Sequence, residues 1–208
     1  MDVDKEIAER ILTRMGTQRR FVAAVCGAAD LGKSFLSDAI SGQLNRLGVP
    51  AGLLPMDSFL TDRESRVEQN LSGYQPEACN LKEVERLVGL FKQGNDIAYS
   101  PYDHTTGKTQ SPALEISGAR VLIVEGLHSM HGALVSYIGM SLFIHTTDER
   151  LRKIRREADI VKRRQSVAYS RAVEPVEFRH YKQQVAPYRD KADLCLFLEK
   201  RWQYRLER

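Results

Sequence analysis

The amino-acid sequence predicts an α/β fold in which a parallel β-sheet is covered by helices on both faces. The first observation is that residues 21–26, 121–126 and 141–145 form nearly uninterrupted apolar runs. Such runs are typical of strands that are buried on both faces, as in parallel sheets. The second observation is that stretches with helical spacing of apolar residues lie between these runs. Strands that alternate with helices along the chain predict a parallel sheet between helical layers.

Local signals predict the bounds of each element. Gly48 and Pro50 end the second helix, Asn80 is a candidate N-cap, and Thr147 with Asp148 starts a basic helix. The predicted helices cover residues 4–16, 33–47, 81–92 and 175–185, with the basic helix from 148. The predicted strands cover residues 21–26, 51–54, 121–126, 141–145 and 192–198. Residues 60–79 and 98–118 are rich in polar and turn-forming residues and are expected to be irregular.

Length and composition indicate one globular domain over residues 1–208. The chain is 42% hydrophobic and 28% charged, which excludes collagen, coiled coil and wholesale disorder. Within this domain we expect an N-terminal helix (1–18), a basic lid region (150–172) and a C-terminal tail (199–208). The sequence leaves two roles open for the tail, which either docks back on the body or mediates self-association into a homo-oligomer.

The expected location is a reducing cytoplasm, with no membrane partner. No apolar run approaches the roughly 20 residues that span a bilayer, and the charged N-terminus is unlike a secretory signal. The three cysteines are widely spaced and form neither a metal-binding spacing nor a disulfide framework.

The charge of the chain is unevenly distributed. Residues 1–149 hold 14 Lys/Arg and 19 Asp/Glu, whereas residues 150–208 hold 17 Lys/Arg and 8 Asp/Glu. Eight of the basic residues fall within 150–164. This cluster is open to three interpretations: a nucleic-acid surface, a solvated helix face, or a site for a small polyanion. The sequence carries no recognisable nucleic-acid-binding module, so we rank nucleic acid last and expect no such partner.

The segment between the first strand and the second helix matches the phosphate-binding pattern G-x-x-x-x-G-K-[ST]. It consists of Gly27, Ala28, Ala29, Asp30, Leu31, Gly32, Lys33 and Ser34. Glycines let backbone N–H groups surround phosphate oxygens, and the next helix directs its positive end at the same anion. Lys33 can reach the β- and γ-phosphates of ATP, and Ser34 can ligate Mg²⁺.

Two residues depart from an ideal loop. Asp30 adds a carboxylate to an anion site, and Phe35 stands where many P-loop kinases carry a threonine for the α-phosphate.

Two acidic residues follow buried strands and complete the candidate site. Asp57 follows the second strand, and Glu125 ends the third. Ligands of open α/β sheets bind at the carboxyl ends of the strands. Asp57 can therefore orient or deprotonate an attacking hydroxyl, and both carboxylates are candidate metal-linked groups. The alternatives are a loop carboxylate for Asp57 and a salt-bridged residue for Glu125. Two nearby histidines, His128 and His131, are expected to be solvated loop residues, with a place at the border of the pocket as the alternative.

At this point the chain resembles the uridine kinase/phosphoribulokinase family of P-loop kinases, over about residues 20–197. The matching segments are 27–34, 55–59, 73–78, 92–94, 101–103, 124–126, the basic helix from 150, and 188–193. The resemblance implies a three-layer P-loop NTPase fold, with a five-stranded parallel sheet flanked by helices and a basic lid. It also implies ATP and Mg²⁺, and transfer of the γ-phosphoryl group to a small-molecule hydroxyl acceptor. It assigns Asp57 as catalytic base and Glu125 as metal-linked.

The complete set of candidate residues follows. Asp57 and Lys33 are the catalytic candidates, and Ser34, Asp57 and Glu125 are the metal candidates. Nucleotide contacts are expected from residues 27–35 and from the lid residues Arg152, Arg155 and Arg163. Acceptor contacts are expected from Tyr74, Tyr102, Asp103 and His104, with a loop-anchoring role as the alternative for Tyr102 and Asp103.

The chain departs from uridine kinases mainly on the acceptor side. Tyr74 replaces the acid that holds a ribose diol, and Gly107 replaces a histidine. The lid lacks two arginines, at Ala158 and Gln165. The resemblance therefore supports a kinase more firmly than it supports uridine as acceptor. A nucleotide-binding protein without phosphotransfer activity is the alternative function.

Overall fold

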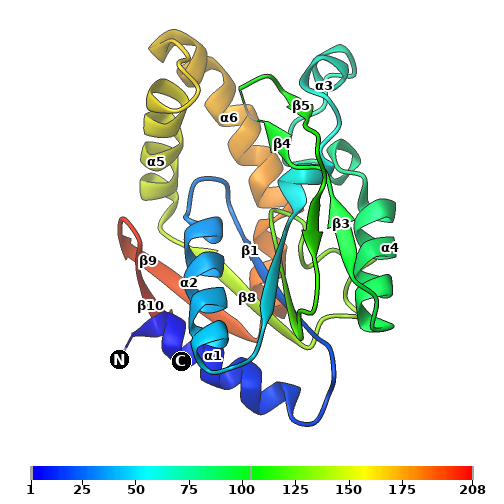
Figure 1. Ribbon diagram of the computed structural model, residues 1–208. Helices are drawn as coiled ribbons and strands as arrows, with labels where there is room; N and C mark the ends of the chain where they lie inside the picture. Colours follow the sequence, from blue (N-terminus) through cyan, green and yellow to red (C-terminus); the bar gives the residue numbers. More distant parts are fainter. Residues whose placement is uncertain (1, 104, 208) are drawn as a thin grey trace.

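Six strands form the central sheet, in the order β10-β9-β8-β1-β7-β2 (Figure 1). The computed structural model describes residues 2–103 and 105–207. The strands of this sheet are β1 (Phe21–Gly27), β2 (Ala51–Pro55), β7 (Val121–Glu125), β8 (Met140–His145), β9 (Leu194–Lys200) and β10 (Gln203–Glu207). Five of them are parallel, and only β10 is antiparallel to its neighbour β9. The prediction of a parallel α/β sheet is confirmed.

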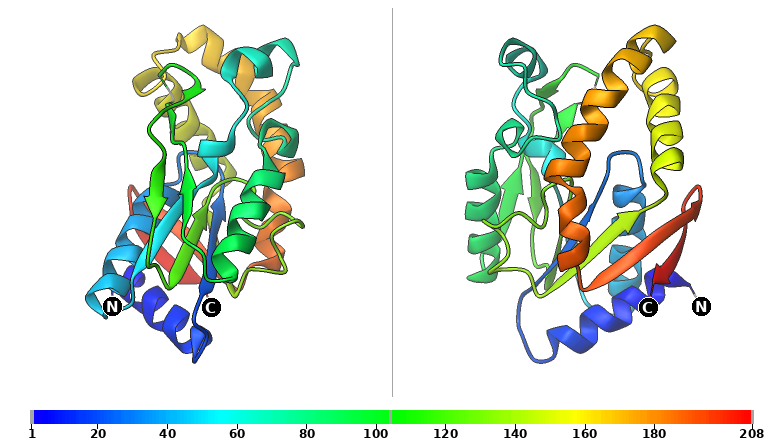
Figure 2. Two further views of the ribbon diagram at one scale, coloured as in Figure 1. Left: turned by 45° about the vertical axis from the view of Figure 1, so that its right-hand side comes forward. Right: turned by 180° about the vertical axis from the view of Figure 1, so that it is seen from behind.

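Helices pack on both faces of this sheet (Figure 2). The α-helices are α1 (Val3–Met15), α2 (Lys33–Arg46), α3 (Arg63–Glu68), α4 (Leu81–Lys92), α5 (Asp148–Val161) and α6 (Val167–Gln184). The short 3-10 helices are η1 (Met56–Phe59), η2 (Pro76–Ala78) and η3 (Ala186–Lys191). The two predicted N-caps are also confirmed, because Asn80 and Thr147 each accept a backbone hydrogen bond at the start of α4 and α5.

Two hydrophobic clusters anchor the central strands. In one cluster Val22 and Leu122 pack with Phe91 of α4, and in the other Ile123 packs with Ile40 of α2. Consecutive residues 122 and 123 thus point to opposite faces, as the strand period of two requires. Every residue of β1, β7 and β8 is buried. Apart from Glu125, Ser141 and His145, the residues of these strands are apolar or glycine because helical layers cover both of their faces.

Three predictions of local structure were wrong. The segment 199–208 is not a tail, because β10 pairs with β9 and adds a sixth strand. Residues 98–118 contain two small antiparallel ribbons, formed by β3 (Ile97–Tyr99) with β6 (Leu114–Ile116) and by β4 (Tyr102–Asp103) with β5 (Lys108–Thr109). Helix α6 begins at Val167, where the Ser166 side chain caps it by accepting a hydrogen bond from the Tyr169 N–H. The helix then continues through Pro175. The basic lid region therefore spans α5 and the start of α6.

Candidate active site

The phosphate-binding loop joins β1 to α2, and a hydrogen bond spans it from one end to the other. Gly27 and Gly32 adopt positive φ values of 142° and 79°, and Gly32 is the residue that precedes the first turn of α2. The Lys33 Nζ donates a hydrogen bond of 3.1 Å to the Ala28 carbonyl oxygen across the loop. The glycines and the N-terminus of α2 therefore lie where the sequence predicts a phosphate-binding loop.

Strand register brings three oxygen-bearing side chains to one end of the sheet. Glu125 at the end of β7 is the register partner of Val25 in β1 and of Pro55 in β2. Asp57 follows in η1, two residues after Pro55. The Ser34 hydroxyl donates a hydrogen bond of 2.8 Å to Glu125 Oε1. Residues from three separate segments thus meet at the carboxyl ends of adjacent parallel strands, where ligands of such sheets bind.

Glu125 is a buried carboxyl group with an altered pKa. Its residue exposure is 8%. Burial raises its pKa above the ordinary glutamate value, Lys33 opposes this effect, and the nearby negative charge of Asp57 adds to the increase. A carboxylate in this position gains from an additional cation.

The donor set fits Mg²⁺. Magnesium prefers hard oxygen ligands, and it is usually held by one or two carboxylates together with substrate phosphates. The Ser34 hydroxyl and the carboxylates of Glu125 and Asp57 are such ligands. Across the described ranges, no cluster of three or more His, Cys, Asp or Glu side chains is arranged to hold a metal by itself.

Asp30 joins the phosphate-binding loop to the basic lid. Its carboxylate forms ion pairs with Arg155 (2.5 Å), Lys162 (3.1 Å) and Arg163 (3.0 Å), and its side chain is 8% exposed. Burial by itself raises the pKa of Asp30. The three cations lower this pKa by more than burial raises it, so it lies well below the usual range. Asp30 adopts a φ of 63°, which is uncommon for a residue other than glycine. The carboxylate that the sequence places in an anion site is thus turned toward the lid.

The lid residues do not all face the loop. Arg155 and Arg163 contact the loop because both donate hydrogen bonds to the Asp30 carboxylate. Arg152 instead donates a hydrogen bond of 2.7 Å to Glu174 of α6 and lies over the Phe178 ring. Lys162 also reaches Asp30, and the sequence analysis did not single it out. The only signal for Lys162 was its membership of the basic cluster.

The acceptor-side candidates occupy different environments. Tyr74 is 3% exposed, and its hydroxyl oxygen accepts a hydrogen bond of 3.4 Å from the Ala29 N–H of the phosphate-binding loop. Tyr102 accepts a hydrogen bond of 3.1 Å from Arg66, and its strand β4 packs against η1, which carries Asp57. Asp103 accepts hydrogen bonds from the Thr105 N–H and from the Gln110 side chain, so it stabilises its own turn. His104 lies outside the described residues.

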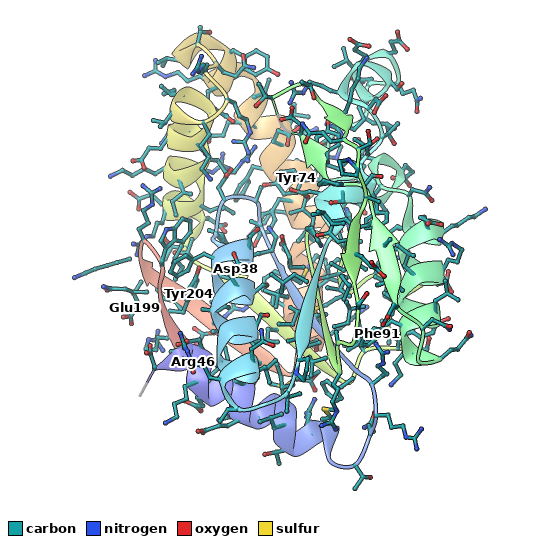
Figure 3. All side chains as sticks on the ribbon, viewed as in Figure 1. Asp38, Arg46, Tyr74, Phe91, Glu199 and Tyr204 are labelled. Atoms are coloured by element: carbon teal, nitrogen blue, oxygen red, sulfur yellow. The ribbon has the colours of Figure 1, made fainter. Side chains whose placement is uncertain are left out.

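The C-terminal hairpin covers the outer side of the phosphate-binding loop. The Tyr204 hydroxyl donates a hydrogen bond that is shared between the Leu31 and Gly32 carbonyl oxygens, each at 3.0 Å. Figure 3 shows Tyr204 beside α2. A Cβ atom on Gly32 would overlap both Tyr204 and Trp202. Docking on the body was one of the two roles that the sequence left open for this segment, and these contacts show that it docks on the loop.

His128 is a buried residue and not the solvated loop histidine that we expected. It is 3% exposed, its Nε2 donates a hydrogen bond of 3.1 Å to the Tyr74 carbonyl oxygen, and its Nδ1 faces the Tyr188 hydroxyl. Burial, with a smaller contribution from His131, lowers the pKa of His128 to about 4. The folded protein therefore holds a neutral imidazole behind the Tyr74 segment.

This buried histidine predicts a loss of stability in mild acid. Between pH 7 and pH 5 the unfolded chain protonates His128 but the folded protein does not, so the free energy of unfolding falls by about 2 kcal/mol. Denaturant unfolding at the two pH values, for the wild type and His128→Gln, measures this component. The variant is expected to lose less stability over the same pH interval. An identical pH dependence in the two proteins would contradict the assignment.

The similarity of this chain to known proteins identifies its family. The sequence profile of the Phosphoribulokinase / Uridine kinase family matches residues 22–198. The chain belongs to this family. Among curated relatives, uridine-cytidine kinase-like 1 of Mus musculus is 28% identical over 196 residues, which cover 87% of this chain and 34% of that protein. The chloroplastic phosphoribulokinase of Mesembryanthemum crystallinum is 28% identical over 94 residues, which cover 45% of this chain and 23% of that protein.

A solved structure supports the fold of this family member. The D-glycerate 3-kinase of Cryptococcus neoformans var. grubii superposes with a TM-score of 0.71 at 13% identity, over the full length of both chains. The matched regions span about a quarter to a third of the length of the two curated relatives. Within the part of the chain that the structure describes, none of the helices has the length and apolar character needed to cross a bilayer.

Proposed function

We propose that this protein is an ATP-dependent kinase that transfers the γ-phosphoryl group to a hydroxyl of a small molecule. The observation that carries the proposal is the meeting of Ser34, Glu125 and Asp57 beside the phosphate-binding loop. A phosphate-binding loop alone indicates a nucleotide, whereas a second carboxylate at the strand edge offers a position for an acceptor hydroxyl. Membership of the family supports the same reaction class.

The loop would bind the phosphate chain of ATP. Backbone N–H groups of the loop and the N-terminus of α2 would hold phosphate oxygens. Lys33 would exchange its contact with the Ala28 carbonyl oxygen for the β- and γ-phosphates and neutralise charge that develops during transfer. Ser34 would hold Mg²⁺, with Glu125 and Asp57 as carboxylate partners. The ion would supply charge neutralisation of the phosphates.

Asp57 would act on the acceptor. A carboxylate at this position can accept the proton of the attacking hydroxyl and orient its oxygen toward the γ-phosphorus. Tyr102, on the strand that packs against η1, is the best-placed of the described acceptor-side candidates. Tyr74 would act indirectly, because it is buried and contacts the loop. The acceptor class that we propose is a nucleoside, a sugar or a related metabolite.

The lid would close over the nucleotide. Arg155 and Arg163, with Lys162, already lie beside the loop and could transfer from Asp30 to phosphate oxygens. Closure of a basic lid excludes water and limits ATP hydrolysis without transfer. We also propose that the enzyme acts in a reducing cytoplasm, because all three of its cysteines are free thiols.

The experiment that tests the proposal measures ADP release with ATP and Mg²⁺ against a panel of nucleosides, sugars and vitamins. We expect one class of acceptor to raise the rate well above the rate without acceptor, and mass spectrometry to detect its phosphorylated form. Lys33→Ala should abolish the stimulation, whereas Lys82→Ala, at an exposed position of α4, should not. Two results would refute a kinase that uses this loop. One is a rate of ADP release that no compound of the panel raises, and the other is an equal rate in the Lys33 variant and the wild type.

A second candidate function is nucleotide binding without phosphotransfer. The observation that favours it is Asp30, since three lid cations are already paired with a carboxylate of the protein itself. Tight ATP binding without turnover on the same panel would favour this candidate over the first.

A further inference from the structure

One side of the phosphate-binding loop carries an aromatic pair, in which Phe35 is exposed and Trp202 is half-buried. Phe35, directly after Ser34, is 50% exposed, although it lies in the first turn of α2. Its ring stacks on Trp202, with 5.6 Å between the centroids and 21° between the planes. The two residues come from opposite ends of the chain, so the pair exists only in the folded protein.

The position of Trp202 is held by several contacts. It lies in the turn between β9 and β10 and adopts a φ of 62°, a conformation that a bulky side chain adopts at a cost. The hydrogen bonds from Tyr204 to the loop carbonyl oxygens fix the hairpin, and the absence of a side chain on Gly32 leaves room for the indole. Arg201 also lies over the indole ring, at 5.4 Å. The aromatic pair is therefore a preorganised surface.

The order of the phosphates along the loop would direct the nucleoside of a bound nucleotide toward this surface. The γ-phosphoryl group must face Asp57 and Glu125, where the acceptor would react, and Lys33 reaches the β- and γ-phosphates. In that orientation the start of α2, with Ser34 and Phe35, would hold the α-phosphate. The nucleoside must leave the loop on the side of Phe35, away from the acceptor.

We propose that the Phe35–Trp202 pair is the surface on which the base of the bound nucleotide stacks. This inference rests on the proposed function. Trp202 lies outside the matched residues 22–198, so its role is argued here from its contacts with the loop. Stacking on aromatic rings tolerates different bases because every base has a π-face. The ligand class is therefore a nucleoside triphosphate, with a larger gain for purines than for pyrimidines.

The test compares a non-hydrolysable ATP analogue with inorganic tripolyphosphate, which lacks a base. Trp202 is the only tryptophan in the chain, so quenching of its fluorescence reports directly on a base beside it. In the wild type we expect the analogue, but not tripolyphosphate, to change this fluorescence strongly. By calorimetry, Trp202→Leu and Phe35→Leu should each weaken binding of the analogue about ten-fold, while binding of tripolyphosphate stays within about two-fold.

Two further variants keep the test specific. Trp202→Phe should retain most of the affinity for the analogue because it keeps an aromatic ring. Phe197→Leu changes an aromatic residue of the same hairpin that packs on His145, and it should leave both affinities unchanged. Equal wild-type affinities for the analogue and tripolyphosphate, or equal losses of both in the leucine variants, would overturn the base surface and leave the proposed kinase standing. Failure of the wild type to bind either ligand would overturn both proposals.

Discussion

Replacement of Asp57 by asparagine is expected to lower acceptor-dependent ADP release by about a thousand-fold. Asparagine retains the size of the side chain and a hydrogen-bonding oxygen, but it cannot take the proton of the attacking hydroxyl at neutral pH. Binding of the nucleotide should change little, since the loop and Lys33 remain. Steady-state rates with the best acceptor from the panel, together with the dissociation constant of an ATP analogue, separate the two effects.

The matched control is Asp62→Asn. Asp62 is an exposed residue at the start of α3, its side chain makes no capping hydrogen bond there, and asparagine suits that position equally well. This control should retain the wild-type rate. Similar rates for Asp57→Asn and the wild type would remove Asp57 from the reaction, and a large loss of nucleotide affinity would assign it a binding role instead.

The second large effect is expected from Gly27→Ala, which should lower the free energy of unfolding by about 3 kcal/mol. Gly27 has a φ of 142°, and it is the register partner of Ile144 in β8. A Cβ atom at this position would overlap the Ile144 carbonyl oxygen. Relief would require two central strands to separate, because the clashing atom belongs to the backbone. Denaturant unfolding at neutral pH measures the loss.

Gly42→Ala is the matched control, and it is expected to raise the free energy of unfolding where Gly27→Ala lowers it. Gly42 lies within α2, and a Cβ atom there would meet nothing within 4 Å. Alanine is the better helix former, so this variant should be more stable than the wild type by about 0.5–1 kcal/mol. If Gly27→Ala were as stable as Gly42→Ala, the first glycine of the loop would not be required by strand packing.

Local patterns were sufficient for the elements that build the site. The run 21–26 predicts β1 because helical layers cover both faces of a central parallel strand and exclude polar side chains. Glu125 and Asp57 could be assigned to one edge because parallel strands all present their carboxyl ends there. The bounds of α6 were wrong because Pro175 is tolerated within a helix whose start is fixed by the Ser166 cap. The small ribbons within 98–118 were missed because strands of two or three residues leave no periodic signal.

The sequence by itself determined the parallel α/β sheet, the phosphate-binding loop and the two strand-end carboxylates, because each depends on residues that are neighbours in the chain or on the shared polarity of parallel strands. Only the tertiary structure decided which distant groups face the loop. It directs Asp30 to Arg155, Lys162 and Arg163, buries His128 against the Tyr74 segment, and stacks Trp202 on Phe35. These contacts join segments that are far apart in sequence, so the packing of whole helices and of the terminal hairpin sets them. The basic cluster is open to several polyanionic partners in the sequence, but in the folded protein three of its residues pair with Asp30, a carboxylate of the loop itself.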